Sequence, residues 1–261
     1  MLIEIAGVPA EVICRYPENE RFLQDYASDS PPWFTVAPHS NDLIRMQRDF
    51  DRMDEADGVP KHKRPDGFLE NNAIHALLAE RLVEHDVLLM HGSALCMDGE
   101  AYIFTAESGT GKSTHARLWR EVFGKRVWMI NDDKPMLRIE ESGVTVYGTP
   151  WDGKHHLSRN ASAPLKAIVK LERDETNHIA PLAKADAFPV LMKQCYSSKH
   201  PATMARIMEL EKRLLDVAEL YRLGCGMTPD AAHVAWEAMR KNQGISRETG
   251  FAIDKNSKKG E

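Results

Sequence analysis

A segment near the middle of the chain has the residue types of a phosphate-binding loop. It runs Ala-Glu-Ser-Gly-Thr-Gly-Lys-Ser-Thr over residues 106–114. The glycines let the backbone turn so that several N–H groups point at one anion. Lysine can then reach the terminal phosphates of a nucleotide, and the serine hydroxyl can bind the accompanying Mg²⁺. The residues expected to bind the phosphates are Ser108, Gly109, Thr110, Gly111, Lys112, Ser113 and Thr114.

The residues on either side of this loop have the pattern that such a loop requires. An apolar run over 101–105 precedes it, and Leu118, Trp119 and Val122 follow it at helical spacing. Strand, glycine-rich turn and helix is the context of phosphate-binding loops, because the helix N-terminus adds favourable partial charge. One departure is Ala106, where the usual pattern begins with Gly. The alternative is a Gly/Ser-rich turn that happens to precede a lysine.

Two carboxylates and a histidine follow other apolar runs. Asp132 and Asp133 come after residues 127–130, and His91 comes after residues 87–90. In an open α/β sheet, ligands bind outside the carboxyl ends of the strands, so we expect these groups to meet the phosphate loop. Phosphoryl transfer needs a metal ligand and a group that takes the acceptor's proton, and paired carboxylates supply both. Considered alone, the pair could equally be a polar turn after a strand.

A turn over residues 150–156 contains Trp, Asp, Lys and two His at the end of another expected strand. In the functional interpretation, Asp152 binds the acceptor or a metal and Lys154 binds a phosphate. The alternative is a surface turn with a packed Trp151. His155 and His156 are a poor metal pair because adjacent side chains point apart.

Composition excludes several classes of protein. The chain has 261 residues, of which 43% are hydrophobic and 28% charged, and its formal net charge is −5. This balance argues against a nucleic-acid binder, and no apolar run is long enough for a membrane span. The cysteines are scattered without a C-x-x-C pair, which predicts reduced thiols and a cytoplasmic protein. Cys225 is expected to pack rather than react. A basic stretch over residues 58–65 predicts a solvated connector, with contact to an acidic peptide or phosphate as the alternative.

The remaining pattern predicts the elements that position these groups. The expected strands cover residues 2–5, 12–15, 31–36, 87–90, 101–105, 127–130, 137–140, 144–147 and 165–171. We expect one helix over residues 68–85, a second directly after the phosphate loop and a last one after Thr228–Pro229. Another helix should end at Gly224, because apolar residues before it recur at helical spacing: Leu210, Leu214, Val217, Ala218 and Tyr221. Asp98-Gly99 predicts a hairpin turn. Residues 244–261 are polar and lysine-rich, which predicts disorder.

Together these motifs resemble the HPr kinase/phosphorylase and ATP-dependent PEP carboxykinase superfamily. The resemblance rests on His91-Gly92, on the run from Ser108 to Thr114, and on Asp132-Asp133 about twenty residues later. It covers residues 88–171 and is greatest to small stand-alone kinases that phosphorylate serine or a peptide. It implies an α/β fold with a mixed sheet flanked by helices, in which residues 1–60 form a β-rich portion and 61–243 the phosphate-loop domain with a helical end.

The resemblance also implies a role for each matching residue. Lys112 and Ser113 take the phosphate and metal roles, Asp132 is the acid/base residue, and Asp133 is a second metal ligand. His91 lies beside the transferred phosphate. HPr kinase has a stretch with Glu, Arg and Gly after its paired carboxylates, whereas residues 148–155 take that place here, which argues against HPr as the substrate.

The functional expectation is a kinase that uses ATP and Mg²⁺ to phosphorylate a hydroxyl, foremost a serine of a peptide or small molecule. The alternative is a module that binds ATP and signals to a partner without transferring phosphate. We expect no nucleic-acid or membrane partner, and the sequence leaves a homo-oligomer open.

Overall fold

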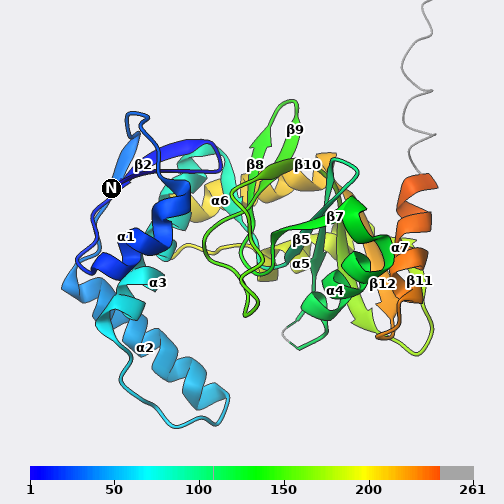
Figure 1. Cartoon of the computed structure of the whole chain (residues 1–261), viewed down its shortest axis with the longest axis horizontal. Helices are drawn as coiled ribbons and strands as arrows, with labels where there is room; N and C mark the ends of the chain where they lie inside the picture. Colours follow the sequence, from blue (N-terminus) through cyan, green and yellow to red (C-terminus); the bar gives the residue numbers. More distant parts are fainter. Residues whose placement is uncertain (108, 242–261) are drawn as a thin grey trace, which may run out of the picture.

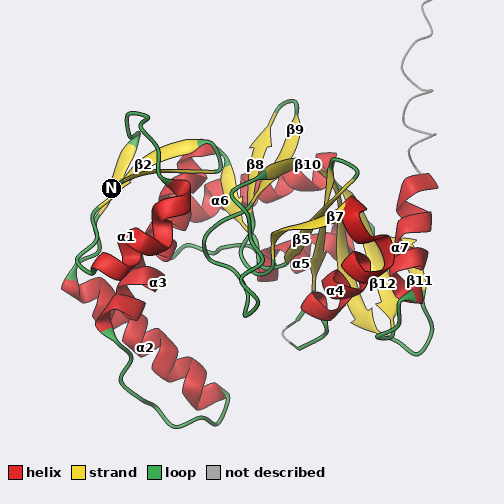
Figure 2. Ribbon diagram, viewed as in Figure 1, coloured by secondary structure: helices red, strands yellow, loops and turns green. Residues whose placement is uncertain are grey.

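The computed structural model describes residues 1–107 and 109–241. Ser108, expected to bind phosphate, and the expected disordered tail at 244–261 lie outside the described residues. The described chain is α/β, with a nine-stranded mixed sheet, a three-stranded sheet and seven α-helices (Figure 2). The strands are β1 Leu2–Ile5, β2 Val8–Val12, β3 Phe34–Val36, β4 Val87–Leu89, β5 Ser93–Met97, β6 Glu100–Thr105, β7 Val127–Asn131, β8 Met136–Glu140, β9 Gly143–Tyr147, β10 Ser162–Arg173, β11 His178–Pro181 and β12 Glu219–Cys225. The α-helices are α1 Pro17–Leu23, α2 Ser40–Ala56, α3 Asp66–Leu82, α4 Lys112–Phe123, α5 Lys184–Gln194, α6 Pro201–Val217 and α7 Asp230–Lys241.

Parallel pairing at the centre of the large sheet brings several strand ends to one edge. β10 pairs in parallel with β6 on one side and with β12 on the other. β5 is antiparallel to both β6 and β7, so β7 runs in the same direction as β6. The carboxyl ends of β6, β7, β10 and β12 therefore lie at the same edge, where an α/β sheet binds its ligands.

Two pairs of helices cover the two faces of the large sheet (Figure 1). α4 and α7 cover one face, where Trp119 and Met239 pack against Tyr102 and Phe104. α5 and α6 cover the other face. The buried side chains of the sheet thus serve two cores, which explains why its strands are apolar on both faces.

The small sheet forms a third core with α3 and with part of the 150–156 loop. Ile74, Leu78 and Trp151 pack against strands β1–β3. α2 projects from this part of the molecule (Figure 1). The basic stretch after α2 folds back on the helix, with ion pairs from Arg64 to Asp54 and from Lys61 to Glu55. These contacts agree with a connector, because the stretch pairs with its own helix.

Most expected strands and the Asp98-Gly99 hairpin are confirmed, but one strand is misplaced. The strand expected at 12–15 is wrong, because β2 spans Val8–Val12 and pairs with β1 across a turn at Ala6–Gly7. Pro9 looked like a break, yet it sits opposite Glu4 within the strand pair.

The helix expected to continue to Gly224 is also wrong. α6 ends at Val217, and Glu219–Cys225 forms strand β12 beside β10. Ala218 and Tyr221 extend the helical spacing of Leu210 and Leu214 by coincidence. The C-terminal end is therefore helical except for this strand.

Helices α1, α2 and α5 were not predicted, and α1 and α2 lie in the portion at 1–60 that was expected to be β-rich. In α2 only Leu43 and Asp54 are buried, although apolar residues such as Leu43, Met46 and Phe50 do recur at helical spacing. α5 has Pro189 in its interior, which normally disfavours a helix. No helix among the described residues has the length and hydrophobicity that crossing a membrane would require.

A buried carboxyl group on α6 makes the core sensitive to pH. Glu211 is 1% exposed, and its Oε2 has no hydrogen-bond partner among the described residues. Burial raises the pKa of Glu211 from 4.5 to about 7. A raised carboxyl pKa stabilises the folded protein at low pH, and this contribution is lost as the pH rises through the folded-state value.

We therefore expect the free energy of unfolding of the parent to fall by on the order of 3 kcal/mol between pH 5 and pH 8, relative to Glu211→Gln. The amide cannot ionise, so the variant lacks this contribution. Urea denaturation at the two pH values measures the difference. Glu209→Gln on the same helix is the control, because Glu209 has a lowered pKa outside this window. Equal pH dependence in parent and Glu211→Gln would contradict the assignment.

Candidate functional site

The loop between β6 and α4 has the backbone conformation that its glycines permit. Gly109 and Gly111 have φ values of 75° and 117°, a region that other residues rarely adopt. Gly111 is the residue at the N-terminus of α4. Arg173, at the end of β10, donates a 2.6 Å hydrogen bond to Gly109 O and holds the loop against the sheet edge. The expected order of strand, glycine loop and helix is confirmed, and Arg173 is a supporting residue that the sequence did not indicate.

Lys112 places its ammonium group over this loop. Nζ donates to the carbonyl oxygen of Ala106 at 3.0 Å. Burial lowers the pKa of Lys112, and the nearby Asp133 opposes the shift. The ammonium therefore lies between the loop and the carboxylates, as expected for a phosphate-binding lysine.

Asp132 lies on the α4 side of the strand end. Its side chain is buried and accepts a 2.9 Å hydrogen bond from Ser93 Oγ. Burial raises the pKa of Asp132, while hydrogen bonds from Ser93 and Ser113 oppose the shift. Gly153 packs so closely that a methyl group there would lie 2.9 Å from Asp132 Oδ2. Among the described residues Asp132 makes no ion pair, although the charges of His155 and Arg120 also favour its ionised form.

Asp133 lies among cations. Its Oδ1 is 3.0 Å from His91 Nδ1, and its Oδ2 is 3.7 Å from Lys134 Nζ. Burial alone would raise the pKa of Asp133, but the His91 hydrogen bond and the charges of Lys134, His91 and Lys112 lower it. The carboxylate is therefore ionised near neutral pH.

His91 is held in place by the backbone. Its N–H donates to Gln194 O at 2.7 Å, and its carbonyl oxygen accepts from Thr105 Oγ1 at 2.9 Å. Thr105 ends β6, directly before the glycine loop. His91, Lys112 and the paired carboxylates therefore lie near one another at this sheet edge.

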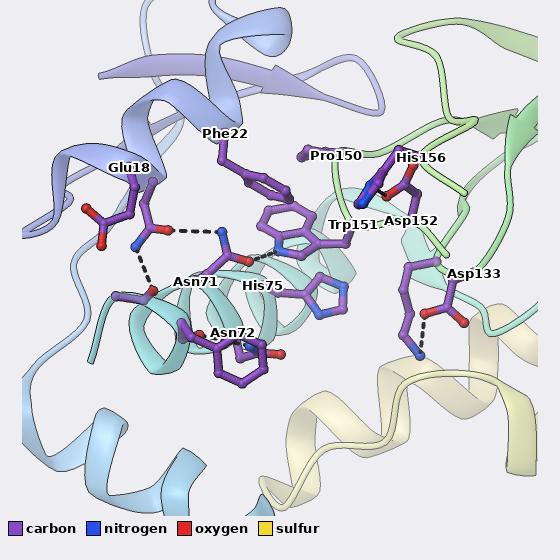
Figure 3. Close-up of a pocket in the computed structure, with 14 residues that line it drawn as sticks. Glu18, Phe22, Asn71, Asn72, His75, Asp133, Pro150, Trp151, Asp152 and His156 are labelled. Atoms are coloured by element: carbon purple, nitrogen blue, oxygen red, sulfur yellow. Dashed lines mark hydrogen bonds and ion pairs between the residues drawn. The ribbon is translucent and has the colours of Figure 1, made fainter. Parts of the chain in front are cut away.

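The two carboxylates face different cavities. Asp132 lines a cavity of about 420 Å³ with Ser113, Arg120 and His155. Asp133 lines a second cavity, of about 520 Å³, shown in Figure 3. The residues around this second cavity are Glu18, Asn19, Phe22, Gly67, Phe68, Asn71, Asn72, His75, Asp133, Lys134, Pro150, Trp151, Asp152 and His156. The cavity of Asp132 thus lies next to the phosphate loop, whereas the cavity of Asp133 lies on the other side of the strand end, next to helices α1 and α3.

Asn131 fixes the loops on both sides of this strand end. Its Oδ1 accepts hydrogen bonds from the N–H groups of Asp133 and Lys134, at 2.8 and 2.6 Å. Its Nδ2 donates to the carbonyl oxygens of Thr149 and Trp151, at 3.1 and 3.2 Å. Asn131 is fully buried, so these bonds form away from water. The sequence analysis missed it because an Asn beside two Asp residues looks like part of the same polar turn.

The 150–156 loop is partly as expected. Asp152 lines the second cavity, but its carboxylate is already bound to His156 Nδ1 at 3.0 Å. Trp151 is packed, as the alternative interpretation expected, and its Nε1 donates to Asn71 at 2.8 Å. Lys154 is exposed and makes no hydrogen bond or ion pair with the described residues, so the structure does not bring it to the other site residues.

The two histidines of this loop face different cavities. His155 lines the cavity of Asp132, and His156 lines the cavity of Asp133. Their side chains therefore point to different sides of the loop. Cys225 is half-buried in the core near α7, where burial raises its pKa, so it packs as expected.

Ser113 and Asp132 fit a Mg²⁺ ion that is bound mainly by a nucleotide. Within the described residues, no group of three or more His, Cys, Asp or Glu side chains is arranged to hold a metal. Mg²⁺ with nucleotides uses one or two protein oxygens and completes its shell with phosphates and water. A serine hydroxyl next to a buried carboxylate that makes no ion pair with the described residues is the donor set that this arrangement requires.

Asn131→Ala should destabilise the protein by about 3 kcal/mol, because it leaves several buried backbone groups without partners. Asn160→Ala is the matched control, since Asn160 makes one exposed hydrogen bond to Asp25 O. Urea denaturation of both variants measures the difference. Equal, small losses in the two variants would show that Asn131 does not organise the site loops.

Comparison with known proteins adds little to this description. No protein-family model matches the chain, and no curated protein matches it. One solved structure that matches is the Hpr(Ser) kinase/phosphatase from Coxiella burnetii, with 11% identity and a TM-score of 0.37. The match covers 60% of this chain and 99% of that chain. A likeness at this level says nothing about activity, so membership of the family stays a prediction.

Proposed function

We propose that the protein is a kinase that transfers the γ-phosphate of ATP, with Mg²⁺, to a hydroxyl group, foremost a serine of a peptide or small molecule. One observation carries this proposal. The glycine loop with Lys112, the Ser113–Asp132 pair and the His91–Asp133 pair meet at one sheet edge, beside a cavity large enough for an acceptor. Simple nucleotide binding would not need the second pair.

The chain's own groups would bind and orient the reactants. The amides of the glycine loop and the N-terminus of α4 would bind phosphate oxygens. Lys112 would exchange its carbonyl partners for a phosphate oxygen and stabilise charge on the group in transfer. When bound, ATP would supply the phosphoryl group and Mg²⁺ would neutralise part of its charge.

The contacts favour a division of work between the two carboxylates. Asp132 is hydrogen-bonded to Ser113 and makes no ion pair with the described residues, so it suits the metal. Asp133 borders the second cavity and touches His91, so it suits the acceptor hydroxyl, whose proton it would accept. The family resemblance implies the reverse assignment, and substitution of each residue separates the two.

Lys112→Ala should reduce phosphate transfer by about 10²-fold or more, because the charge on the transferred group loses its preorganised cation. The fold should persist, since Nζ bonds only to loop carbonyls. Transfer from radiolabelled ATP to a mixture of hydroxyl acceptors measures the effect. Lys125→Ala, in the turn after α4, is the control. Unchanged transfer by Lys112→Ala would refute the proposal.

The Asp132→Asn and Asp133→Asn variants should change different kinetic quantities. Asp133→Asn should lower kcat by about 10²-fold with nearly unchanged Mg²⁺-ATP affinity, because only the proton acceptor is lost. Asp132→Asn should instead raise the Mg²⁺ concentration needed for half-maximal rate. Steady-state kinetics with calorimetry of Mg²⁺-ATP measures both. The opposite pattern would support the roles implied by the resemblance.

ATP consumption distinguishes the kinase from a sensing module. A kinase should consume Mg²⁺-ATP only when a suitable acceptor is present, whereas a sensing module should bind ATP and leave it intact with every acceptor. Chromatography of nucleotides after incubation with acceptor mixtures measures this.

A further inference from the structure

The cavity beside Asp133 has two chemically different ends. At one end Asp133 and Lys134 border the phosphate-binding side. At the other end lie Glu18, from α1, and the first turn of α3 (Figure 3). Aromatic rings line the space between them, and an acceptor that fills the cavity would touch both ends.

The carboxylates at the Asp133 end already have partners within the chain. Asp133 is paired with Lys134 and His91, and Asp152 is paired with His156. A substrate charge at this end would have to compete with existing partners. The hydroxyl is therefore the group that this end accommodates best.

Glu18 at the far end has no such partner. Its side chain makes no hydrogen bond or ion pair with the described residues. The carboxylate lies against Gly67, where an added methyl group would displace the exposed end of the Glu18 side chain. Gly67 thus leaves the space that lets an unpaired carboxylate stand at the mouth of the cavity.

A second carboxylate behind Glu18 adds to the negative charge. Glu70 is fully buried and accepts hydrogen bonds from Arg15 N, Tyr16 N and Asn19 Nδ2, at 2.8, 3.1 and 2.8 Å. All of these donors are neutral amides, and no cation pairs with Glu70 among the described residues. The Arg15 guanidinium instead donates to Ser40 Oγ. Asn19 also lines the cavity, so the charge of Glu70 is close to it.

Exposed rings lie on the same cavity wall. Phe22 is 39% exposed and Phe68 is 46% exposed, although both are large apolar residues. Aromatic faces together with a carboxylate form a favourable environment for an organic cation. Rings left exposed in a cavity also suit a ligand with aliphatic carbon atoms next to its charge.

We infer that the acceptor carries an ammonium or guanidinium group, which binds at Glu18 between the aromatic residues while its hydroxyl lies at Asp133. This inference rests on the proposed kinase function, because it identifies the second substrate of that site. The cation is either a Lys or Arg side chain of a peptide or the amino group of a free hydroxy amine. Both sources present the same chemistry to Glu18.

Paired acceptors test the inference. The peptide arm uses acetylated and amidated serine hexapeptides in which one other position is Lys, norleucine or Glu. The free-amine arm uses L-serine and its N-acetyl derivative. Each is given to the parent, to Glu18→Gln, to Glu18→Lys and to the control Glu20→Gln, an exposed acid on α1 that does not line the cavity. Phosphate transfer and calorimetric binding are both measured.

The parent and Glu20→Gln should prefer the cationic member of a pair by about tenfold in kcat/KM. Glu18→Gln should lose this preference, and Glu18→Lys should prefer the Glu peptide. If the parent prefers the Lys peptide, the cation belongs to a peptide side chain. If it prefers L-serine over N-acetylserine, the cation is the amino group of a small hydroxy amine.

Two results would overturn the inference: no preference in the parent, or a preference that persists in Glu18→Gln. If the parent transfers phosphate equally to all acceptors, the kinase proposal survives and only the cation site fails. If the parent transfers phosphate to none of them, the kinase proposal fails, and the binding measurements alone test the cation site. The site is supported if the parent binds the Lys peptide more tightly than the norleucine peptide and Glu18→Gln does not. Equal binding of the two peptides by the parent refutes the site.

Discussion

The buried amide of Asn131 is the interaction on which the candidate site depends. It accepts hydrogen bonds from the backbone of the paired-aspartate turn and donates others to the loop that carries Trp151. Through Trp151 and Asn71 this network reaches the N-terminal helices. One side chain therefore aligns the carboxylates, the 150–156 loop and the wall of the acceptor cavity. Buried hydrogen bonds of this kind define a single conformation, because every alternative leaves a polar group without a partner.

The direction of Asp132 and Asp133 follows from that constraint. Because the turn is fixed, neighbouring side chains point to opposite sides of the strand end, one to Ser113 and the other to His91. Their environments differ accordingly. Burial outweighs the hydrogen bonds and more distant charges around Asp132 and raises its pKa, whereas the His91 hydrogen bond and nearby cations outweigh burial and lower the pKa of Asp133. Two adjacent residues of the same type can thus perform different tasks, one toward a metal and one toward an acceptor.

Much of the site was predictable from the sequence because its signals are local. Apolar runs followed by Gly-rich or acidic residues indicate strand ends, and parallel strands bring those ends together. The second cavity was not predictable, because α1, α3 and the 150–156 loop are distant in sequence and meet only through packing. Glu18 has no local signal at all; an exposed acid in the first turn of a short helix is an ordinary feature.

The errors in the fold have equally specific causes. β12 was taken for helix because Ala218 and Tyr221 happen to fit a helical spacing. α2 was missed although its apolar residues recur at helical spacing, and α5 was missed because it contains Pro189. None of these elements contains a residue of the phosphate loop or the paired carboxylates. These errors therefore concern the scaffold and not the segments that carry the candidate site.

Mass spectrometry of a peptide and metabolite extract tests the central claim most directly. The extract, from cells that make the protein, would be incubated with Mg²⁺-ATP and either the parent or Lys112→Ala. The account predicts a phosphate adduct on a hydroxyl compound that forms only with the parent. The absence of any such adduct, together with calorimetric binding of Mg²⁺-ATP by the parent, would contradict a kinase and favour a nucleotide-sensing module.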